Sequence, residues 1–286
     1  MIQNHATLRE IRLFLQIEVS KIYSPGETNT ITGLIMEHCG FPSPQSLLNP
    51  DHRPGETTVA QINEIVSEIH THKPIQYILG ETSFYELNIR IDENTLVPRP
   101  ETEEMIYKIA GSQVKAPGRI IDMGTGSGCI ALALKKQYPD ALVTGLDLST
   151  GALEIARGNG VHNHLEVEWI KGDILGENTL REQAKFDLIV SNPPYVLNSE
   201  KSVMDHNVLN FEPHAALFVE DSDPLIFYKA LACLSGALLS SDGTVWLEIN
   251  ENFGTEVAGL MSDSGFTQTS IHKDIHEKQR FVQARF

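Results

Sequence analysis

The segment from residue 119 to residue 138 constrains the fold of this chain most. Residues 119–123 are predicted to form a buried strand, which runs directly into Gly124-Thr125-Gly126-Ser127-Gly128, and residues 129–138 are predicted to form a helix. Glycines let the backbone turn sharply and let a ligand approach the main chain closely. The amides at the start of the helix can then hold a negative group. The segment therefore predicts a ligand site on an α/β scaffold.

The remainder of the C-terminal two thirds continues the alternation of strands and helices. We predict strands at 142–147, 166–171, 186–191, 244–249 and near 267–271 and 280–284, with helices at 151–160, 225–234 and 254–264. Strands that alternate with helices imply a mainly parallel sheet covered on both faces. The predicted fold class is therefore α/β, with a Rossmann-like sheet.

The first 80 residues have a different pattern, which is typical of helices. Thr7 and Glu10 have the spacing of a capping box, and apolar residues follow from Leu8 at steps of three and four. Between residues 84 and 97 apolar and polar residues alternate, and Asp92-Glu93-Asn94 is predicted to supply a turn. We therefore predict three parts: a helical bundle (1–80), a connecting β-hairpin (81–98) and an α/β domain (99–286).

Composition limits the possible partners and compartments. The chain has 38 acidic and 22 basic residues, a formal net charge of −16, which argues against non-specific binding to nucleic acid or to an anionic membrane. No stretch approaches the roughly 18 consecutive apolar residues of a membrane helix, and the N-terminus does not resemble a secretory signal. Three widely spaced cysteines fit a reducing compartment. We therefore predict a cytoplasmic protein. We also predict no metal site, because His70 and His72 do not share a helix face.

A carboxylate ends the strand that follows the glycine loop. Asp147 is placed where it can accept hydrogen bonds from both hydroxyls of a ribose. The loop has the spacing G-x-G-x-G, whereas the dinucleotide version would need glycine at Cys129. We therefore predict a nucleoside cofactor, and S-adenosylmethionine in preference to NAD.

The tetrapeptide Asn192-Pro193-Pro194-Tyr195 follows the predicted strand 186–191, so it lies at the same edge of the sheet as the glycine loop. Two consecutive prolines fix the backbone and remove two amide donors, leaving carbonyl oxygens beside the Asn192 carboxamide. We predict that the Asn192 oxygen and the Pro193 carbonyl each accept one hydrogen of a planar –NH2 group, with Tyr195 packed over the substrate plane. Holding that nitrogen in line with a methyl sulfonium would favour the transition state of N-methylation.

These motifs resemble those of the class I methyltransferases that modify exocyclic or amide nitrogens. Four further segments, 74–80, 84–85, 96–103 and 211–213, are similar in content and order to the bacterial release-factor glutamine methyltransferases, and the resemblance runs from about residue 73 to residue 286. It implies methylation, with S-adenosylmethionine, of the glutamine side-chain amide in the Gly-Gly-Gln loop of class I peptide chain release factors.

The resemblance also implies that 1–80 recognises the substrate and that 99–286 is the S-adenosylmethionine-dependent methyltransferase domain. It implies roles for individual residues as well. The family's donor site falls on Gly124, Thr125, Gly126, Ser127, Gly128, Asp147 and Asn192, and its substrate site on Asn192, Pro193, Pro194 and Tyr195. Of these, Asn192, Pro193 and Tyr195 are expected to be catalytic. Ile174 follows Asp173 where the family often has an aromatic residue near adenine, and it can offer an apolar face. Arg99, Glu101 and Phe84 either contact ligand or only cap and pack, and Glu248 is left without a role.

Three alternative functions stay open. A sister enzyme could act on a glutamine of a ribosomal protein, although the run 99–103 favours release factors by resemblance. An amino methyltransferase acting on adenine would need the same tetrapeptide after base flipping, but neither the first 90 residues nor the rest of the chain is basic. A catalytically idle donor-binding module is disfavoured because Asp147 and Asn192 are both present.

Overall fold

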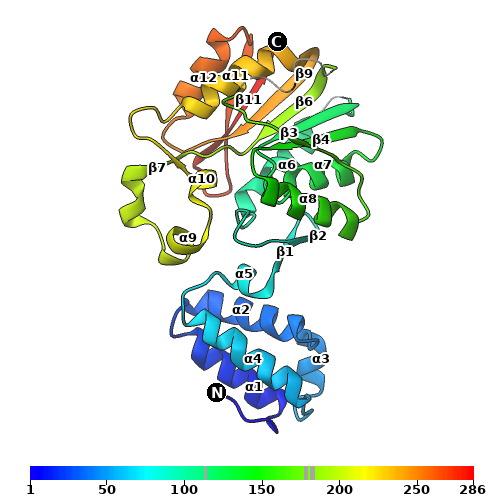
Figure 1. Cartoon of the computed structure of the whole chain (residues 1–286), viewed down its shortest axis with the longest axis vertical. Helices are drawn as coiled ribbons and strands as arrows, with labels where there is room; N and C mark the ends of the chain where they lie inside the picture. The colour runs from blue at the N-terminus through cyan, green and yellow to red at the C-terminus, as the bar shows by residue number, and fades with distance from the viewer. Residues whose placement is uncertain (113–114, 177–179, 181–183) are drawn as a thin grey trace. The chain divides into compact units, whose positions relative to one another are not determined.

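The computed structural model of the chain describes residues 1–112, 115–176, 180 and 184–286. They form two compact units. The first comprises residues 1–80 with 205–211, and the second comprises residues 81–204 with 212–286 (Figure 1).

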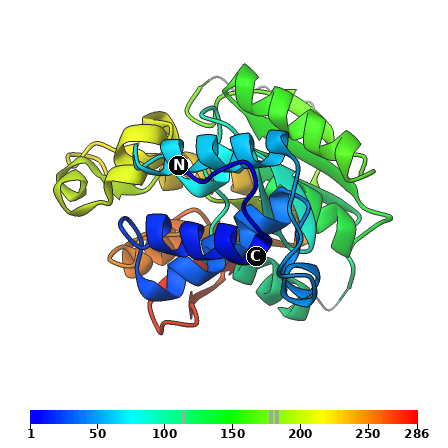
Figure 2. The ribbon, with the colours of Figure 1, turned by 90° about the horizontal axis from the view of Figure 1, so that it is seen from below.

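The first unit is helical, as predicted. Its helices are α1 (Leu8–Val19), α2 (Pro25–His38), α3 (Ser43–Leu48), α4 (Glu56–Ile69), α5 (Ile75–Leu79) and α9 (His206–Phe211). The predicted capping box starts α1, where the Thr7 amide donates to Glu10 Oε2 at 2.7 Å and the Glu10 amide donates to Thr7 Oγ1 at 3.3 Å. The apolar stripe of α1 packs with residues of α2 and α4 in one buried cluster, and Figure 2 shows these helices, coloured blue to cyan, from below.

The second unit begins with a hairpin of β1 (Glu81–Phe84) and β2 (Leu87–Arg90). The hairpin was predicted, but the position of its turn was wrong. The chain reverses at Tyr85 and Glu86, with φ of 50° and 54°, and residues 92–94 come after the second strand. A two-residue turn needs this left-handed backbone to match the twist of its strands. Neither Tyr nor Glu is a residue that signals such a turn, so the sequence pattern favoured the acidic segment downstream.

The core of the second unit is a seven-stranded sheet of order β10-β11-β9-β6-β3-β4-β5. Its strands are β3 (Arg119–Met123), β4 (Leu142–Asp147), β5 (Glu168–Lys171), β6 (Phe186–Ser191), β9 (Leu239–Glu248), β10 (Gln268–Lys273) and β11 (Gln279–Arg285). Five neighbouring strands, β9, β6, β3, β4 and β5, are parallel, and β11 is antiparallel to both of its neighbours. This confirms the predicted mainly parallel sheet.

The order of the strands creates a switch point at the centre of the sheet. The chain moves from β3 through β4 to β5 on one side, and then returns to place β6 on the other side of β3. The loops that follow β3 and β6 therefore diverge from adjacent strands. Open α/β sheets bind their ligands beyond the carboxyl ends of the strands at such a point.

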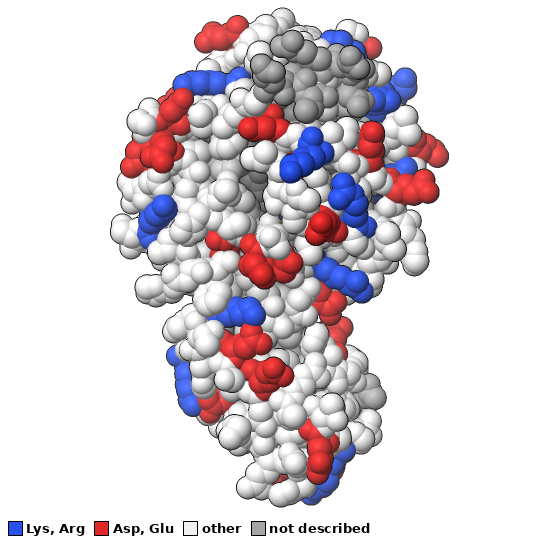
Figure 3. All heavy atoms as spheres, in the orientation of Figure 1, with Lys and Arg blue, Asp and Glu red and all other residues white. Residues whose placement is uncertain are grey.

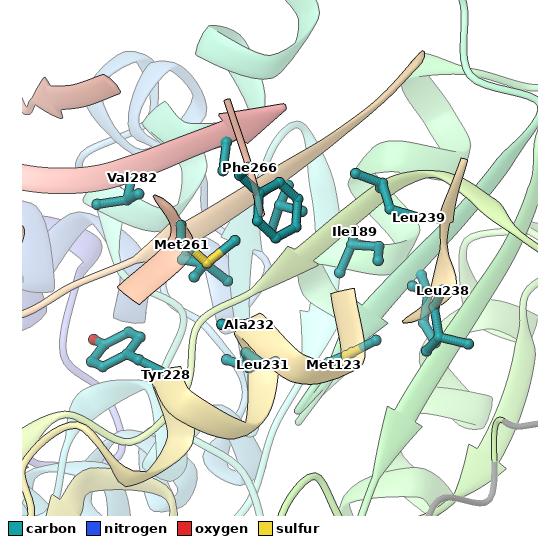
Figure 4. Packing of buried hydrophobic residues seen from close by; sticks show 14 of the residues in the cluster. Met123, Ile189, Tyr228, Leu231, Ala232, Leu238, Leu239, Met261, Phe266 and Val282 are labelled. Atoms are coloured by element: carbon teal, nitrogen blue, oxygen red, sulfur yellow. The ribbon is translucent and has the colours of Figure 1, made fainter. Parts of the chain in front are cut away.

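Helices cover both faces of the sheet (Figure 1). One face carries α6 (Pro100–Ser112), α7 (Cys129–Gln137) and α8 (Thr150–His162), and the other carries α11 (Ile226–Leu238) and α12 (Gly254–Asp263). On the second face, Tyr228 and Leu231 of α11 and Met261 of α12 pack against sheet residues such as Ile189 and Val282 (Figure 4). This close packing holds the carboxyl ends of the strands in one fixed arrangement.

Two short pairs of elements complete the second unit. β7 (Val196–Leu197) and the 3-10 helix η1 (Asn198–Val203) follow the Asn192–Tyr195 segment, and α10 (His214–Leu217) leads into β8 (Phe218–Val219), which pairs in parallel with β7. Among the described residues, no helix combines the length and the apolar character needed to cross a membrane.

Candidate active site

The glycine loop between β3 and α7 has a backbone that only glycine adopts readily. Gly124, Gly126 and Gly128 have φ of +79°, +54° and +81°. The amides of Gly124 and Thr125 donate to the carbonyl of Leu146 at 2.8 and 2.9 Å, so the loop folds over the end of β4. A Cβ atom at Gly128 would lie 2.7 Å from Cη2 of Trp169 and 3.1 Å from Cβ of Ala156. Gly128 is therefore required both by its dihedral angle and by space.

Trp169 in β5 supports the glycine loop, a role that sequence reasoning missed. Its ring lies against Gly128 and against Gly145 of β4, where an added Cβ would come within 2.5 Å of Cζ3. No sequence signal distinguishes this tryptophan from any apolar strand residue, because the contact joins two strands and a loop in space.

Asp147 lies beside the glycine loop, at the carboxyl end of β4. One carboxylate oxygen accepts from the amide of Gly126 at 2.8 Å, and the other accepts from the amide of Ser149 at 2.8 Å. Ile174 also lies next to the loop, since its Cδ1 is 3.7 Å from the position of a Cβ at Gly124. The structure thus brings the predicted donor-site residues together, while their contacts with a ribose and with adenine stay predictions.

Asp122, at the end of β3, is fully buried beneath the loop. Its Oδ2 accepts from Thr125 Oγ1 at 2.5 Å. Burial raises the pKa of this carboxyl to about 7, and the nearby charge of Asp147 also raises it, whereas the Thr125 hydroxyl and the Ala131 amide lower it. This side chain therefore titrates near neutral pH at the floor of the loop.

The Asn192-Pro193-Pro194-Tyr195 corner lies on the strand adjacent to the one that carries the glycine loop. β6 pairs with β3, and Ser191 Oγ donates to the carbonyl of Met123 at 2.6 Å, which links the last residues of the two strands. Pro193 is buried and Asn192 is half-buried. The prediction that this corner and the glycine loop share one edge of the sheet is confirmed.

The side chain of Asn192 belongs to a hydrogen-bond network that includes the buried residues Thr102 and Glu248. Its Nδ2 donates to Thr102 Oγ1 at 3.1 Å, and Thr102 Oγ1 donates in turn to Glu248 Oε2 at 2.7 Å. The hydroxyl of Tyr195 donates to Glu248 Oε1 at 3.0 Å. Sequence reasoning missed Thr102 and left Glu248 unassigned, although an acidic residue at the end of a buried strand was a usable signal.

Glu248 is 1 % exposed at the carboxyl end of β9. Burial raises its pKa, while the hydrogen bonds from Thr102 and Tyr195 and the charge of Arg280 lower it. Burial likewise raises the pKa of Tyr195 far above its usual range, and the negative charge of Glu248 adds to this effect. The Tyr195 hydroxyl therefore serves as a hydrogen-bond donor to Glu248. The packing of the Tyr195 ring over a substrate stays a prediction.

Two residues before α6 donate hydrogen bonds to Glu212 of the Phe211-Glu212-Pro213 motif. Arg99 Nη2 donates to Glu212 Oε1 at 2.6 Å, and Glu212 Oε2 also accepts from the amide of Val97 at 3.2 Å. The Glu212 side chain is 1 % exposed. Glu101 lies in the first turn of α6, where acidic residues complement the helix dipole. Phe84 is 1 % exposed and packs in the interior.

The residues present fit S-adenosylmethionine. The backbone of residues 124–128 forms a cradle whose dihedral angles favour glycine, Asp147 stands at the strand end where ribose hydroxyls bind, and Ile174 adds an apolar side chain. When bound, this cofactor supplies a methyl group activated by a sulfonium. Among the described residues, no cluster of His, Cys, Asp and Glu could hold a metal ion.

The chain is similar in fold to solved structures of methyltransferases. The chain is similar to a methyltransferase from Pyrococcus furiosus, with a TM-score of 0.53 and 17% identity, over 80% of this chain and 97% of that one. It is also similar to a 16S rRNA N2 G1207 methyltransferase of T. thermophilus, solved with AdoMet and guanosine, with a TM-score of 0.52 and 16% identity over 72% of this chain and 49% of that one. Residues 108–215 match the model of the methyltransferase small domain. The fold and the site thus define a class I, S-adenosylmethionine-dependent methyltransferase.

Two further comparisons narrow the class to a family. Residues 18–80 match the PrmC N-terminal domain. A release factor glutamine methyltransferase of Flavobacterium psychrophilum is 42% identical over 84% of this chain and 85% of its own length, and one of Bacteroides thetaiotaomicron is 34% identical over 97% and 99%. The chain belongs to the release factor glutamine methyltransferase family.

Proposed function

We propose that this chain transfers a methyl group from S-adenosylmethionine to the side-chain amide nitrogen of the glutamine in the Gly-Gly-Gln loop of class I peptide chain release factors. One observation carries the proposal: the Asn192–Tyr195 corner and the glycine loop leave adjacent strands whose ends are joined by the Ser191–Met123 hydrogen bond. A nitrogen held at the corner therefore lies next to a donor held in the loop.

The chemistry of the reaction explains why a corner of hydrogen-bond acceptors is suitable. An amide nitrogen is a poor nucleophile because its lone pair is delocalised into the carbonyl. We infer that Asn192 Oδ1 and the Pro193 carbonyl each accept one hydrogen of the glutamine –NH2 group. As the nitrogen attacks, it becomes pyramidal and gains positive charge, and two fixed acceptors stabilise that state more than the planar ground state. Their rigidity avoids the cost of reorganising the site during the reaction.

The helical first unit is assigned to recognition of the protein substrate. It leaves large apolar side chains of α1, Leu13 and Ile17, exposed, which is a feature of surfaces that bind partners. On the face shown in Figure 3, the described Lys and Arg side chains stand apart from one another among acidic ones. Together with the net charge of −16, this favours a protein substrate over nucleic acid. The three free cysteines fit action in the cytoplasm.

The proposal is tested by incubating the protein with a labelled methyl donor and a purified class I release factor, in its natural form and with Gly-Gly-Ala in place of Gly-Gly-Gln. We expect label in the natural factor alone. A ribosomal-protein mixture and an adenine-containing oligonucleotide serve as competing substrates. Equal labelling of the two factors, or preferential labelling of a competing substrate, would overturn the assignment.

A further inference from the structure

Thr102 of α6 lies between the carboxamide of Asn192 and the carboxylate of Glu248. It is 3.1 Å from Asn192 Nδ2 on one side and 2.7 Å from Glu248 Oε2 on the other. Thr102 and Glu248 are both buried, so water does not compete for the hydrogen bond between them. The three side chains come from segments that are distant in the sequence and meet at the carboxyl ends of β6 and β9.

The two hydrogen bonds that link Asn192, Thr102 and Glu248 have only one possible direction while Glu248 is a carboxylate. A carboxylate accepts hydrogen bonds and donates none, so the single proton of the Thr102 hydroxyl points to Glu248. The Thr102 oxygen can then only accept, and Asn192 must turn its –NH2 group toward it. Asn192 Oδ1 is consequently directed away from Thr102 and remains an acceptor.

The second oxygen of Glu248 is also engaged by a donor. It accepts from the Tyr195 hydroxyl at 3.0 Å. Burial raises the pKa of Glu248, and the hydrogen bonds from Thr102 and Tyr195 and the positive charge of Arg280 in β11 oppose that rise by stabilising the carboxylate. On the main chain, the carbonyl of Glu248 accepts from the hydroxyl of Tyr228 at 3.2 Å, which fixes the end of the strand. Glu248 is therefore held in place from α6, from the corner itself and from α11.

We propose that Glu248 and Thr102 are positioning residues that orient the Asn192 carboxamide and thereby make the site select a glutamine amide over a glutamate carboxylate. This inference rests on the proposed function. With Oδ1 facing the substrate, Asn192 accepts a hydrogen from the –NH2 group of glutamine. A reversed carboxamide would present –NH2 instead, which repels the amide hydrogens and suits a carboxylate oxygen.

The test compares Thr102→Val and Glu248→Gln with the conservative variant Thr102→Ser. Valine removes the hydroxyl. Glutamine at position 248 can instead donate a hydrogen bond to Thr102, which would reverse the donor and acceptor roles along the two hydrogen bonds. A matched control is Thr144→Val, because Thr144 in β4 is buried and donates to Glu168 Oε2 at 3.1 Å, away from the corner. Two quantities are measured: kcat on the Gly-Gly-Gln factor, and the affinities of Gly-Gly-Gln and Gly-Gly-Glu factors in the presence of S-adenosylhomocysteine.

We expect Thr102→Val and Glu248→Gln to lower kcat by about tenfold to a hundredfold, the effect of losing one or two hydrogen bonds at a preorganised site. Donor affinity should stay within about twofold, and the preference for glutamine over glutamate should fall by about tenfold, a change that one hydrogen bond can produce. Thr102→Ser and Thr144→Val should retain the wild-type preference. The double variant Thr102→Val/Glu248→Gln should lower kcat no more than the more damaging single variant does, because both residues act through Asn192.

The outcomes separate this inference from the proposed function. If the wild-type protein methylates the factor and Thr102→Val keeps its preference for glutamine, the positioning role is wrong and the function stands. If the wild-type protein prefers glutamine to glutamate in binding, loses that preference on Thr102→Val, and transfers no methyl group, the function is wrong and the positioning role stands. Equal binding of the two factors by the wild-type protein would also overturn the positioning role.

Discussion

Replacing Gly128 by alanine tests how the glycine loop is built. Two costs add at this position. The φ of +81° places an alanine in the left-handed region, which costs about 1–2 kcal/mol. The new Cβ would also lie 2.7 Å from Cη2 of Trp169 and 3.1 Å from Cβ of Ala156, and overpacking of this kind costs about 1–3 kcal/mol. Alanine also lowers the conformational entropy of the unfolded chain, which stabilises the folded state by about 0.4–1 kcal/mol. We therefore expect Gly128→Ala to lower the free energy of unfolding by about 2–4 kcal/mol.

Gly126→Ala is the matched control. Gly126 also has a positive φ, +54°, but no atom lies within 4 Å of an added Cβ. Only the cost of the dihedral angle remains, so we expect a loss of about 1 kcal/mol after the effect on the unfolded chain. The difference between the two variants isolates the contact with Trp169 and Ala156. Trp169→Phe should relieve part of that contact, and the double variant Gly128→Ala/Trp169→Phe should be more stable than the sum of the single effects predicts.

Urea unfolding followed by tryptophan fluorescence measures these energies in the relevant unit, because both tryptophans, Trp169 and Trp246, belong to residues 81–286. Equal destabilisation by Gly126→Ala and Gly128→Ala would refute the steric argument. A strictly additive double variant would refute the assignment of the contact to Trp169.

Three further predictions concern charged side chains. Asp147→Ala should weaken donor binding by about 1–3 kcal/mol, the value of hydrogen bonds to a charged group, and an unchanged calorimetric titration would contradict the ribose assignment. Arg99→Ala leaves the buried Glu212 carboxylate without its partner, and since Arg99 is itself 36 % exposed we expect a loss of about 2 kcal/mol in urea unfolding, less than for a fully buried pair. Arg99→Met/Glu212→Met should be more stable than Arg99→Ala, and an equal or greater loss would count against that reasoning. The folded state raises the pKa of Asp122 from 3.8 to about 7, so it retains a proton that the unfolded chain loses. Wild-type stability should therefore decrease between about pH 4 and about pH 7, by at most about 1.4 kcal/mol per pH unit, relative to Asp122→Asn. A stability difference that does not change with pH would contradict this.

The predicted chemistry came from short segments whose place in the fold follows from local pattern. The strand, loop and helix around Gly124–Gly128 form one continuous run, and Asn192 directly follows a strand of apolar residues. In a parallel sheet all strands end at the same edge, so two such segments were enough to predict a shared site. The wrong position of the hairpin turn has the same origin, because Tyr85 and Glu86 adopt a turn that their side chains do not signal.

The partners of these residues could not be predicted, because they depend on which strands and helices are neighbours. Thr102 and Glu248 are 146 positions apart, and Arg99 and Glu212 are 113 positions apart. Phe211-Glu212-Pro213 was noticed as a motif, yet nothing local showed that its carboxylate would be buried against Arg99. Side chains that lie far apart along the chain meet only after the sheet order is set.

The sequence by itself determined the class of fold, the glycine loop, the acid after the second strand and the proline-rich corner, since each depends on residues that are consecutive or nearly so. Only the tertiary structure decided what holds these parts in place: Trp169 beneath the loop, and Thr102 and Glu248 behind Asn192. The physical reason is that backbone preferences act over a few residues, whereas burial and hydrogen bonding between side chains depend on distances in space.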